Sequence, residues 1–302
     1  MKYPEYSFPL KVDVTNPGHF FACCGLLELA NRLWPGAEGC FDTEKLKFTI
    51  YCQGYSASLE KLIKEVTECE VTGLNEAESK ERGALEEESR QLKKQNQKLT
   101  RFKEKRRKKL GEMARKGAIR LGSPFDLDLN WWQIGDEDTA APKTWAGNQE
   151  IHKVFRSAQD ALGNISNVTN LFYHHDVMRM PKEYQKSKGD QKKTIEPFYF
   201  DARRFAHALD TGFSLDVQSA ETQAYPAVEM LSLIGLQRFR PTPMSNKWAF
   251  EYMIWKIPLS VAVASVVNYC TFLFGDRYCF KLLFRDDQKR YKAFAFSNPI
   301  GG

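Results

Sequence analysis

The chain has 302 residues, enough for one large domain or two ordinary ones, and a hydrophobic content of 42% excludes a largely disordered protein. Its seven cysteines are odd in number and none belongs to a C-x-x-C pair, which argues against a zinc ribbon or a disulfide framework and favours a reducing, cytoplasmic setting. The charged N-terminus is unlike a secretory signal, and no run reaches about twenty uninterrupted apolar residues, so we expect no membrane span.

An alternation of apolar and polar residues opens the chain and predicts a half-buried strand over residues 8–14. Asn16-Pro17-Gly18 then supplies a capping side chain and a first-turn proline for a helix over residues 19–34, which is apolar on nearly all sides. Alternation returns as a second strand over residues 46–52, and residues 58–70 have the spacing of a short amphipathic helix. The order strand, helix, strand is typical of an α+β sandwich, including the ferredoxin-like kind.

Positive charge is concentrated in residues 90–120, which hold fourteen Lys and Arg residues against only Glu104 and Glu112. This segment therefore carries about +12, whereas the whole chain carries +6. It follows the acidic run Glu86-Glu87-Glu88, and acids near the start with bases near the end favour a helix. Because its apolar stripe is thin, we predict a long, solvent-exposed helix or hairpin that projects from the body.

Like charges at helical spacing repel each other, and the basic residues of this segment exceed what a solvated helix face needs. A field this concentrated attracts a polyanion, and phosphate binding by the segment would depend strongly on salt. The alternative is a scaffold whose basic segment docks on an acidic protein surface. The candidate nucleic-acid-binding residues of the segment are Lys93, Lys94, Lys98, Arg101, Lys105, Arg106, Arg107, Lys108, Lys109, Arg115 and Lys116.

Regular patterns continue after the basic segment. Alternation predicts a strand over residues 121–132, and apolar spacing predicts helices over residues 149–162 and 225–236. The most apolar run, residues 257–274, is interpreted as buried core rather than as a membrane span. Three more strands are expected, over residues 248–257, 278–284 and 291–296.

The predicted fold is α+β, with mixed or antiparallel sheets, packed helices and a long basic helical excursion. A ferredoxin-like arrangement is one option at the N-terminus, although three elements do not fix a topology. We divide the chain into an N-terminal α+β part (1–72), a charged helical arm (73–120) and a C-terminal α+β part (121–302) that packs on the first.

Two groups of arginines outside the arm are further candidates for nucleic-acid binding. In Asp201-Ala202-Arg203-Arg204, each arginine either pairs with the acid or contacts a phosphate, since the guanidinium fork matches phosphate oxygens. Arg238 and Arg240 flank Phe239, which suits either a clamp that stacks a base or the capping of a helix end.

Recognisable catalytic motifs are absent: there is no G-x-S-x-G, Walker-type loop, G-x-G-x-x-G or H-E-x-x-H. His174-His175-Asp176 resembles a metal-binding group, but adjacent histidines in a strand point to opposite sides and no third ligand is nearby. His19 at a helix start could act as the general base of an RNA-cleaving enzyme, without a recognisable Tyr or Lys partner. We therefore expect no catalytic residue, metal or cofactor, with an RNA endonuclease as the alternative.

Four stretches carry a resemblance to a known family. They are Asn16-Pro17-Gly18-His19-Phe20-Phe21-Ala22-Cys23-Cys24-Gly25-Leu26-Leu27-Glu28-Leu29-Ala30; Pro124-Phe125-Asp126-Leu127 with Trp131-Trp132; Lys143-Thr144-Trp145-Ala146-Gly147; and Phe200-Asp201-Ala202-Arg203-Arg204 with Tyr225-Pro226-Ala227-Val228-Glu229. Together they resemble a subtype-specific protein of type I-U (also called I-G) CRISPR-Cas loci. The similarity extends over most of the chain.

This resemblance implies a subunit of Cascade, the RNA-guided surveillance complex of antiviral defence, whose partners are other Cascade subunits, CRISPR RNA and target DNA. It implies either a large-subunit-like role, reading the short adjacent motif on duplex DNA, or a guide-RNA-binding or RNA-processing ferredoxin-like subunit. It supplies no catalytic residues. Because guide pairing carries the sequence information, such a protein needs mainly backbone contacts, which suit a projecting basic arm.

Overall fold

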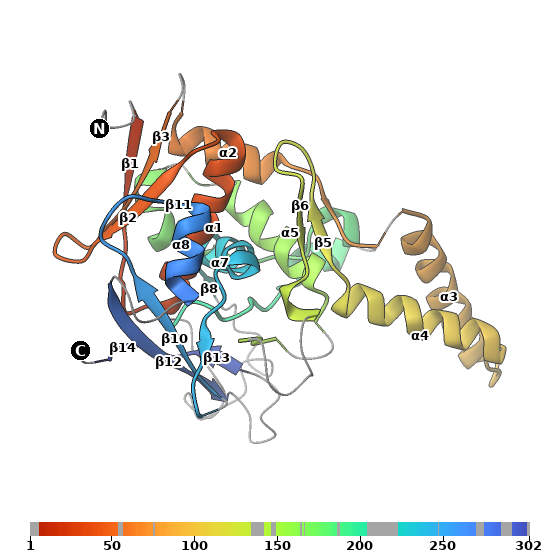
Figure 1. Ribbon diagram of the computed structural model, residues 1–302. Helices are drawn as coiled ribbons and strands as arrows, with labels where there is room; N and C mark the ends of the chain where they lie inside the picture. Colours follow the sequence, from red (N-terminus) through yellow and green to blue (C-terminus); the bar gives the residue numbers. More distant parts are fainter. Residues whose placement is uncertain are drawn as a thin grey trace.

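The computed structural model of the protein describes residues 6–53, 57–74, 76–133, 142–145, 149–163, 165, 167–185, 188–203, 223–246, 248–269, 275–284 and 292–300. Antiparallel sheets pack with helices in a body from which a helical hairpin projects (Figure 1), which confirms the predicted α+β class. One hydrophobic core runs through the N-terminal and C-terminal parts of this body. No helix in these ranges is long and apolar enough to cross a membrane.

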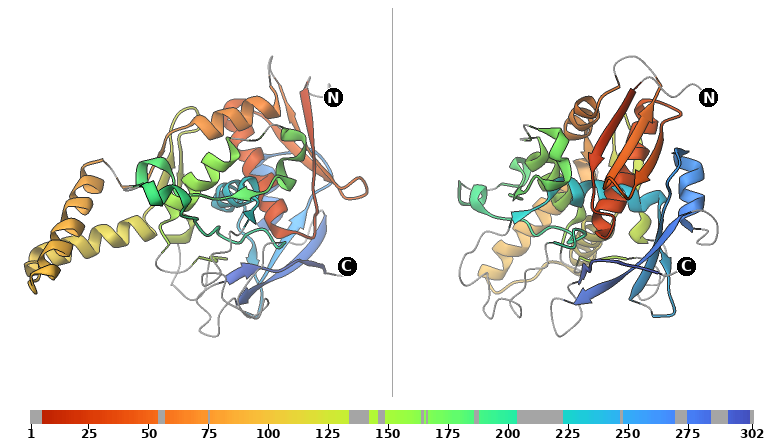
Figure 2. Two further views of the ribbon diagram at one scale, coloured as in Figure 1. Left: turned by 180° about the vertical axis from the view of Figure 1, so that it is seen from behind. Right: turned by 90° about the vertical axis from the view of Figure 1, so that its left-hand side faces the viewer.

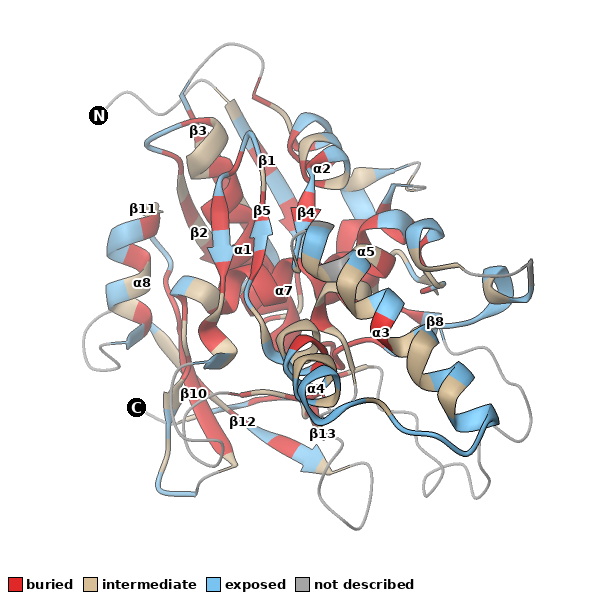
Figure 3. Ribbon diagram, turned by 90° about the vertical axis from the view of Figure 1, so that its right-hand side faces the viewer, coloured by how far each residue is buried: buried red, intermediate tan, exposed pale blue. Residues whose placement is uncertain are grey.

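Two helices that are apolar on all sides lie at the centre of the body, α1 (Pro17–Leu33) and α7 (Pro226–Arg238). Both begin with proline, and the Asn16 side chain accepts the Gly18 N–H at 3.0 Å, as the sequence predicts for the start of α1. Figure 3 shows both helices almost wholly buried. Their all-round apolar character is explained by this position, since every face meets another part of the core.

The two central helices touch through their backbones at a pair of glycines. A Cβ added to Gly25 would lie 2.1 Å from the Leu231 carbonyl oxygen, and one added to Gly235 would lie 2.0 Å from the Phe21 carbonyl oxygen. Any side chain at either position would therefore force the helices apart. This crossing joins the N-terminal part of the chain to the C-terminal part.

The first sheet combines strands from both parts of the chain. Its antiparallel order is β1 (Tyr6–Lys11), β3 (Lys47–Cys52), β2 (Glu38–Asp42) and β11 (Leu259–Ser260). The strands expected over residues 8–14 and 46–52 correspond to β1 and β3, whereas β2 was not expected. Because β3 lies between β1 and β2, the unit β1–α1–β2 is a split β-α-β unit.

The third sheet carries the arm. β4 (Val71–Thr72) follows α2 (Leu59–Glu68) and pairs with β5 (Ile119–Leu121), which in turn pairs with β6 (Leu127–Leu129). The arm is thus inserted between two neighbouring antiparallel strands. Because β4 joins this sheet and not the edge of β1, the described strands do not complete a ferredoxin-like arrangement.

The single strand predicted over residues 121–132 is wrong. The chain turns after β5, where the N–H groups of Phe125 and Asp126 both donate to the Gly122 carbonyl, at 2.9 and 3.0 Å. Asp126 adopts a left-handed φ of 46°, which ends the extended backbone. The expected strand is therefore split into β5, β6 and the short 3-10 helix η1 (Trp131–Gln133).

The second sheet contains the strands expected near the C-terminus. Its order is β13 (Lys292–Phe294), β12 (Asp276–Phe284), β10 (Ala249–Ile254) and β9 (Thr242–Pro243), with β14 (Asn298–Pro299) also paired to β12. Tyr252 of β10 stacks on Phe20 of α1 with ring centroids 4.4 Å apart, which packs this sheet onto the central helices. Figure 2 shows this sheet and the first sheet on the side of the body away from the arm.

The remaining elements lie around this framework. The interpretation of residues 257–274 as buried core is wrong for helix α8 (Val261–Tyr269), which is buried on one face only. Val261 and Ala264 are buried, whereas Val263 and Val266 are 49% and 60% exposed. The other elements are α5 (Ile151–Leu162), η2 (Val168–Tyr173), β7 (Asp176–Val177), η3 (Lys182–Tyr184), η4 (Lys188–Lys192) and β8 (Gln223–Ala224).

Candidate nucleic-acid interface

Most of the basic segment lies in the second helix of an antiparallel helical hairpin, the arm, which is made of α3 (Glu76–Lys94) and α4 (Arg101–Lys116). Thr100 caps α4, its hydroxyl accepting the Lys103 N–H at 3.4 Å. Figure 1 shows the arm extending well beyond the body, so both helices have large solvent-facing surfaces. The sequence predicts a helix or a hairpin between residues 73 and 120, and the structure contains a hairpin.

The face of α4 that meets α3 is neutralised by acids. Arg106 contacts Glu81 at 2.7 Å, and Lys103 contacts Glu88 at 2.6 Å. Hydrogen bonding with Glu81 raises the pKa of Arg106, and the same bond lowers the pKa of Glu81. Arg106 was predicted to bind phosphate, and this stays a prediction; in the structure its guanidinium has Glu81 as a carboxylate partner.

Further cations of the arm have acidic partners within α4. Arg107 lies 2.7 Å from Glu104, and Lys108 lies 3.9 Å from the same carboxylate. Lys116 lies 3.6 Å from Glu112. Counted over both helices, residues 76–116 hold fifteen basic and eight acidic residues, so the arm carries about +7. The local field is weaker than the +12 of residues 90–120 suggested, because the chain folds its acidic stretch back onto its basic one.

The opposite face of α4 carries a stripe of three cations that form no ion pair among the described residues. Arg101, Lys105 and Lys109 follow each other at a spacing of four residues, so they lie on one side of the helix. All three are exposed, and none forms an ion pair within the described part of the chain. Lys94 at the end of α3 and Lys98 in the connecting loop are also exposed. We call Arg101, Lys105 and Lys109 the outer stripe.

Two further candidates on the arm lie beside this stripe. Lys93 is exposed at the end of α3, and its charge contributes to lowering the pKa of Glu104, which responds first to the Arg107 hydrogen bond. Arg115 is half-buried near the end of α4. The arm therefore has an inner face whose cations pair with acids of the hairpin and an outer face whose cations form no ion pair among the described residues.

An ion pair holds the base of the arm against the body. Arg82 of α3 makes two hydrogen bonds to Glu150 at the start of α5, at 3.0 and 2.6 Å. Burial raises the pKa of the Glu150 carboxyl, but the hydrogen bonds from Arg82 and the charge of Lys153 outweigh it and lower the pKa to about 2. The pair links α3 of the arm to α5 of the body.

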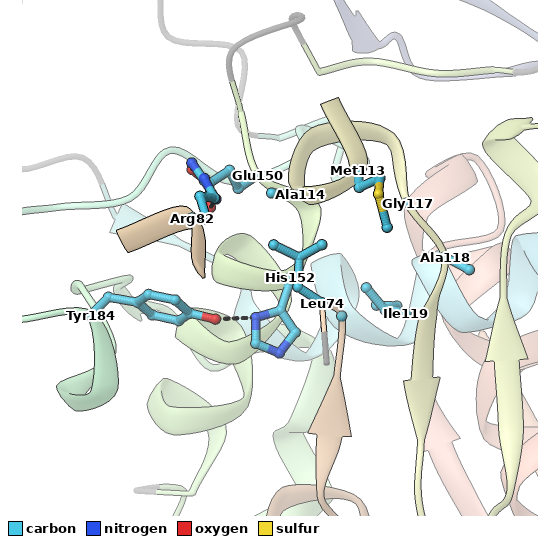
Figure 4. Close-up of a pocket in the computed structure, with 11 residues that line it drawn as sticks. Leu74, Arg82, Met113, Ala114, Gly117, Ala118, Ile119, Glu150, His152 and Tyr184 are labelled. Atoms are coloured by element: carbon cyan, nitrogen blue, oxygen red, sulfur yellow. Dashed lines mark hydrogen bonds and ion pairs between the residues drawn. The ribbon is translucent and has the colours of Figure 1, made fainter. Parts of the chain in front are cut away.

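A cavity of about 50 Å³ lies beside this ion pair (Figure 4). Since one water occupies about 30 Å³ in the liquid, the cavity has room for solvent but not for a nucleotide. His152 donates from Nε2 to the Val71 carbonyl at 2.9 Å and accepts the Tyr184 hydroxyl at Nδ1, so both ring nitrogens are satisfied. Burial lowers the pKa of His152. This neutral histidine links β4, α5 and η3 and is a structural connection.

The arginine motif near residue 201 is held inside the body. Arg203 donates to both carboxylate oxygens of Asp201, at 2.9 and 2.6 Å, and its guanidinium lies 3.6 Å from the centre of the Tyr225 ring. Its Nη2 also donates to the Phe172 carbonyl at 2.6 Å. The ion-pair alternative therefore describes Arg203 in this structure, and its phosphate contact stays a prediction. Arg204 lies outside the described residues.

The second arginine pair corresponds to the end of a helix. Arg238 contacts Glu28 at 2.6 Å, and the Phe239 N–H caps α7 by donating to the Gly235 carbonyl at 2.9 Å. Phe239 is buried against Trp255, so it cannot stack a base, and the clamp alternative is corrected. Arg240 is half-buried, and its carbonyl accepts a hydrogen bond from the Asn268 side chain at 3.0 Å.

His19, the candidate general base, is fully buried at the start of α1. Its Nδ1 accepts the Asp13 N–H at 3.0 Å, and its Nε2 lies 3.8 Å from Asp201. Burial lowers its pKa to about 4, although the Asp201 charge opposes the change. An RNA strand has no access to this side chain. Around His174, no group of three potential metal-ligating side chains is present among the described residues.

One exposed residue of the arm is not among the candidates from the sequence. Phe102 is 81% exposed in the first turn of α4. The signal that could have identified it is the charge of its helical neighbours, since Lys105 and Arg106 occupy the positions three and four residues later.

The chain was compared with family models, curated proteins and solved structures, and no match was found in any of the three.

Proposed function

We propose that this protein is a non-catalytic nucleic-acid-binding subunit of a type I CRISPR RNA-guided surveillance complex. Its arm contacts the backbone of target DNA in a large-subunit-like role. The observation that carries the proposal is the outer stripe, which is exposed and has no acidic partner within the described residues. The resemblance in sequence motifs supplies the biological setting, with other Cascade subunits and CRISPR RNA as partners.

The charge pattern favours a phosphate backbone over a single anion. Arg101, Lys105 and Lys109 recur about every 6 Å along the helix, because four residues rise about 1.5 Å each. Repeated like charges at this spacing repel one another, and a polyanion removes that repulsion. Such contacts give affinity without sequence preference, as guide-directed recognition requires.

The test is the salt dependence of DNA binding by a Lys105→Ala/Lys109→Ala variant. Loss of two phosphate contacts should make the negative slope of log binding constant against log salt concentration shallower by about 1.8. It should also weaken duplex binding by roughly tenfold per contact at about 0.1 M salt. The matched control is Lys45→Ala/Lys64→Ala, which removes the same charge from exposed positions of the body. Equal slopes for the two variants would refute the role given to the arm.

A scaffold role makes a different prediction. If the outer stripe docks on an acidic protein, a partner should remain bound after nuclease treatment and should be lost in the Lys105→Ala/Lys109→Ala variant. Retention of that partner by the variant, together with a reduced salt slope for DNA, supports the nucleic-acid role.

A further inference from the structure

Phe102 is the most exposed of the large hydrophobic side chains in the described ranges, at 81%. It lies in the first turn of α4. Figure 1 shows the start of α4 at the tip of the arm, away from the body. Leaving a phenylalanine in water forgoes about 1.5–3 kcal/mol of burial free energy, so Phe102 adds little to the stability of the folded chain. The arm has other apolar contacts, since Leu85 of α3 and Leu110 of α4 are buried.

The residues around Phe102 have the chemistry of a backbone-binding surface. Arg101 precedes it and Lys105 follows one turn later, while Lys98 lies in the connecting loop; all three are exposed. None of the three forms an ion pair within the described part of the chain. The nearest acid in sequence, Glu104, is occupied by Arg107 at 2.7 Å. An exposed aromatic ring among unpaired cations is the pattern by which proteins bind single strands.

We propose that the tip of the arm binds single-stranded nucleic acid, with a base stacked on Phe102 and the flanking phosphates held by Lys98, Arg101 and Lys105. This inference rests on the proposed function and specifies its ligand. Duplex bases are already stacked on each other, so insertion of a ring between them costs several kcal/mol of unstacking, whereas a single strand offers its bases freely. The tip should therefore prefer a single strand to a duplex.

The test measures fluorescence anisotropy of a labelled 15-nucleotide oligo-dT and of a labelled 15-base-pair duplex, using the full chain. Phe102→Ala should weaken binding of the single strand by about 5- to 100-fold and leave duplex binding within about twofold. Phe102→Tyr should keep the affinity of the original, because the ring is retained. Phe102→Leu should behave like Phe102→Ala, because an apolar side chain without a π face cannot stack.

The variants distinguish failure of this inference from failure of the proposed function. If Phe102→Leu binds the single strand as the original does, or if Phe102→Ala has no effect while Lys105→Ala/Lys109→Ala still weakens binding, the stacking site is refuted and the proposed function stands. If both variants bind normally, the proposed function falls as well. If Phe102→Ala instead releases a protein partner from nuclease-treated preparations and leaves single-strand binding intact, the exposed ring is a protein contact and the inference is overturned.

Discussion

Removing the carboxylate that anchors the arm should loosen α3 without unfolding the body. In Glu150→Gln, the neutral side chain no longer balances Arg82, and both positions are largely shielded, at 16% and 18% exposed. The fall in the pKa of Glu150 from 4.5 to about 2 corresponds to about 3 kcal/mol. Because the folded pKa is depressed, this stabilisation is present above pH 4.5 and is lost as the pH falls towards 2.

Amide hydrogen exchange in α3 is the appropriate assay, since it reports local opening of the arm separately from global unfolding. A double-mutant cycle with Arg82→Gln should give a coupling free energy of about 1–3 kcal/mol. The matched control is the Arg90–Glu87 pair in the same helix, 3.5 Å apart and 60% and 57% exposed, whose coupling should not exceed about 0.5 kcal/mol. Equal coupling in the two cycles would refute the anchoring role.

Two further predictions concern the body. Gly25→Ala should lower the free energy of unfolding in urea by about 1–3 kcal/mol, because its Cβ would lie 2.1 Å from the Leu231 oxygen. Gly83→Ala, whose Cβ would have nothing within 4 Å, should instead stabilise α3 by up to about 1 kcal/mol. Similar values for the two variants would contradict the close helix crossing. His19 has a folded pKa of about 4, so the native state binds fewer protons than the unfolded chain between pH 4 and 6.5, and stability should fall by about 3 kcal/mol as the pH is lowered through this range. His19→Asn should lack this part of the pH dependence, and an unchanged profile would show that His19 does not titrate as described.

Local chemistry made much of the fold predictable. The capping Asn16 and the proline after it mark the start of α1, and the apolar spacing of residues 149–162 and 225–236 anticipates α5 and α7. These signals work because they act within a few residues. They could not reveal β2, a short strand that contains Gly39, or the turn at Gly122 that divides the strand predicted over residues 121–132.

The site was less predictable because its chemistry depends on contacts between distant residues. Arg106 and Lys105 are adjacent in sequence, yet one meets Glu81, 25 residues away, and the other points to solvent. Composition therefore located the arm but could not tell a cation that binds its own chain from one that is free. Helix α8 illustrates the same limit, because apolar residues alone do not tell which face of a helix the core covers.

The insertion of the arm between paired strands makes its length independent of the fold. Val71 faces Leu121 across β4 and β5, so a tight turn could join these strands in place of the entire hairpin. The 16 residues of α4 span about 24 Å, and adding seven residues to each helix would move the tip outward by about 10 Å. On a duplex, where base pairs rise about 3.4 Å, that is a displacement of about three base pairs. The length of the arm can thus be changed by insertion or deletion in its two helices while the body, with its central glycine crossing, stays the same.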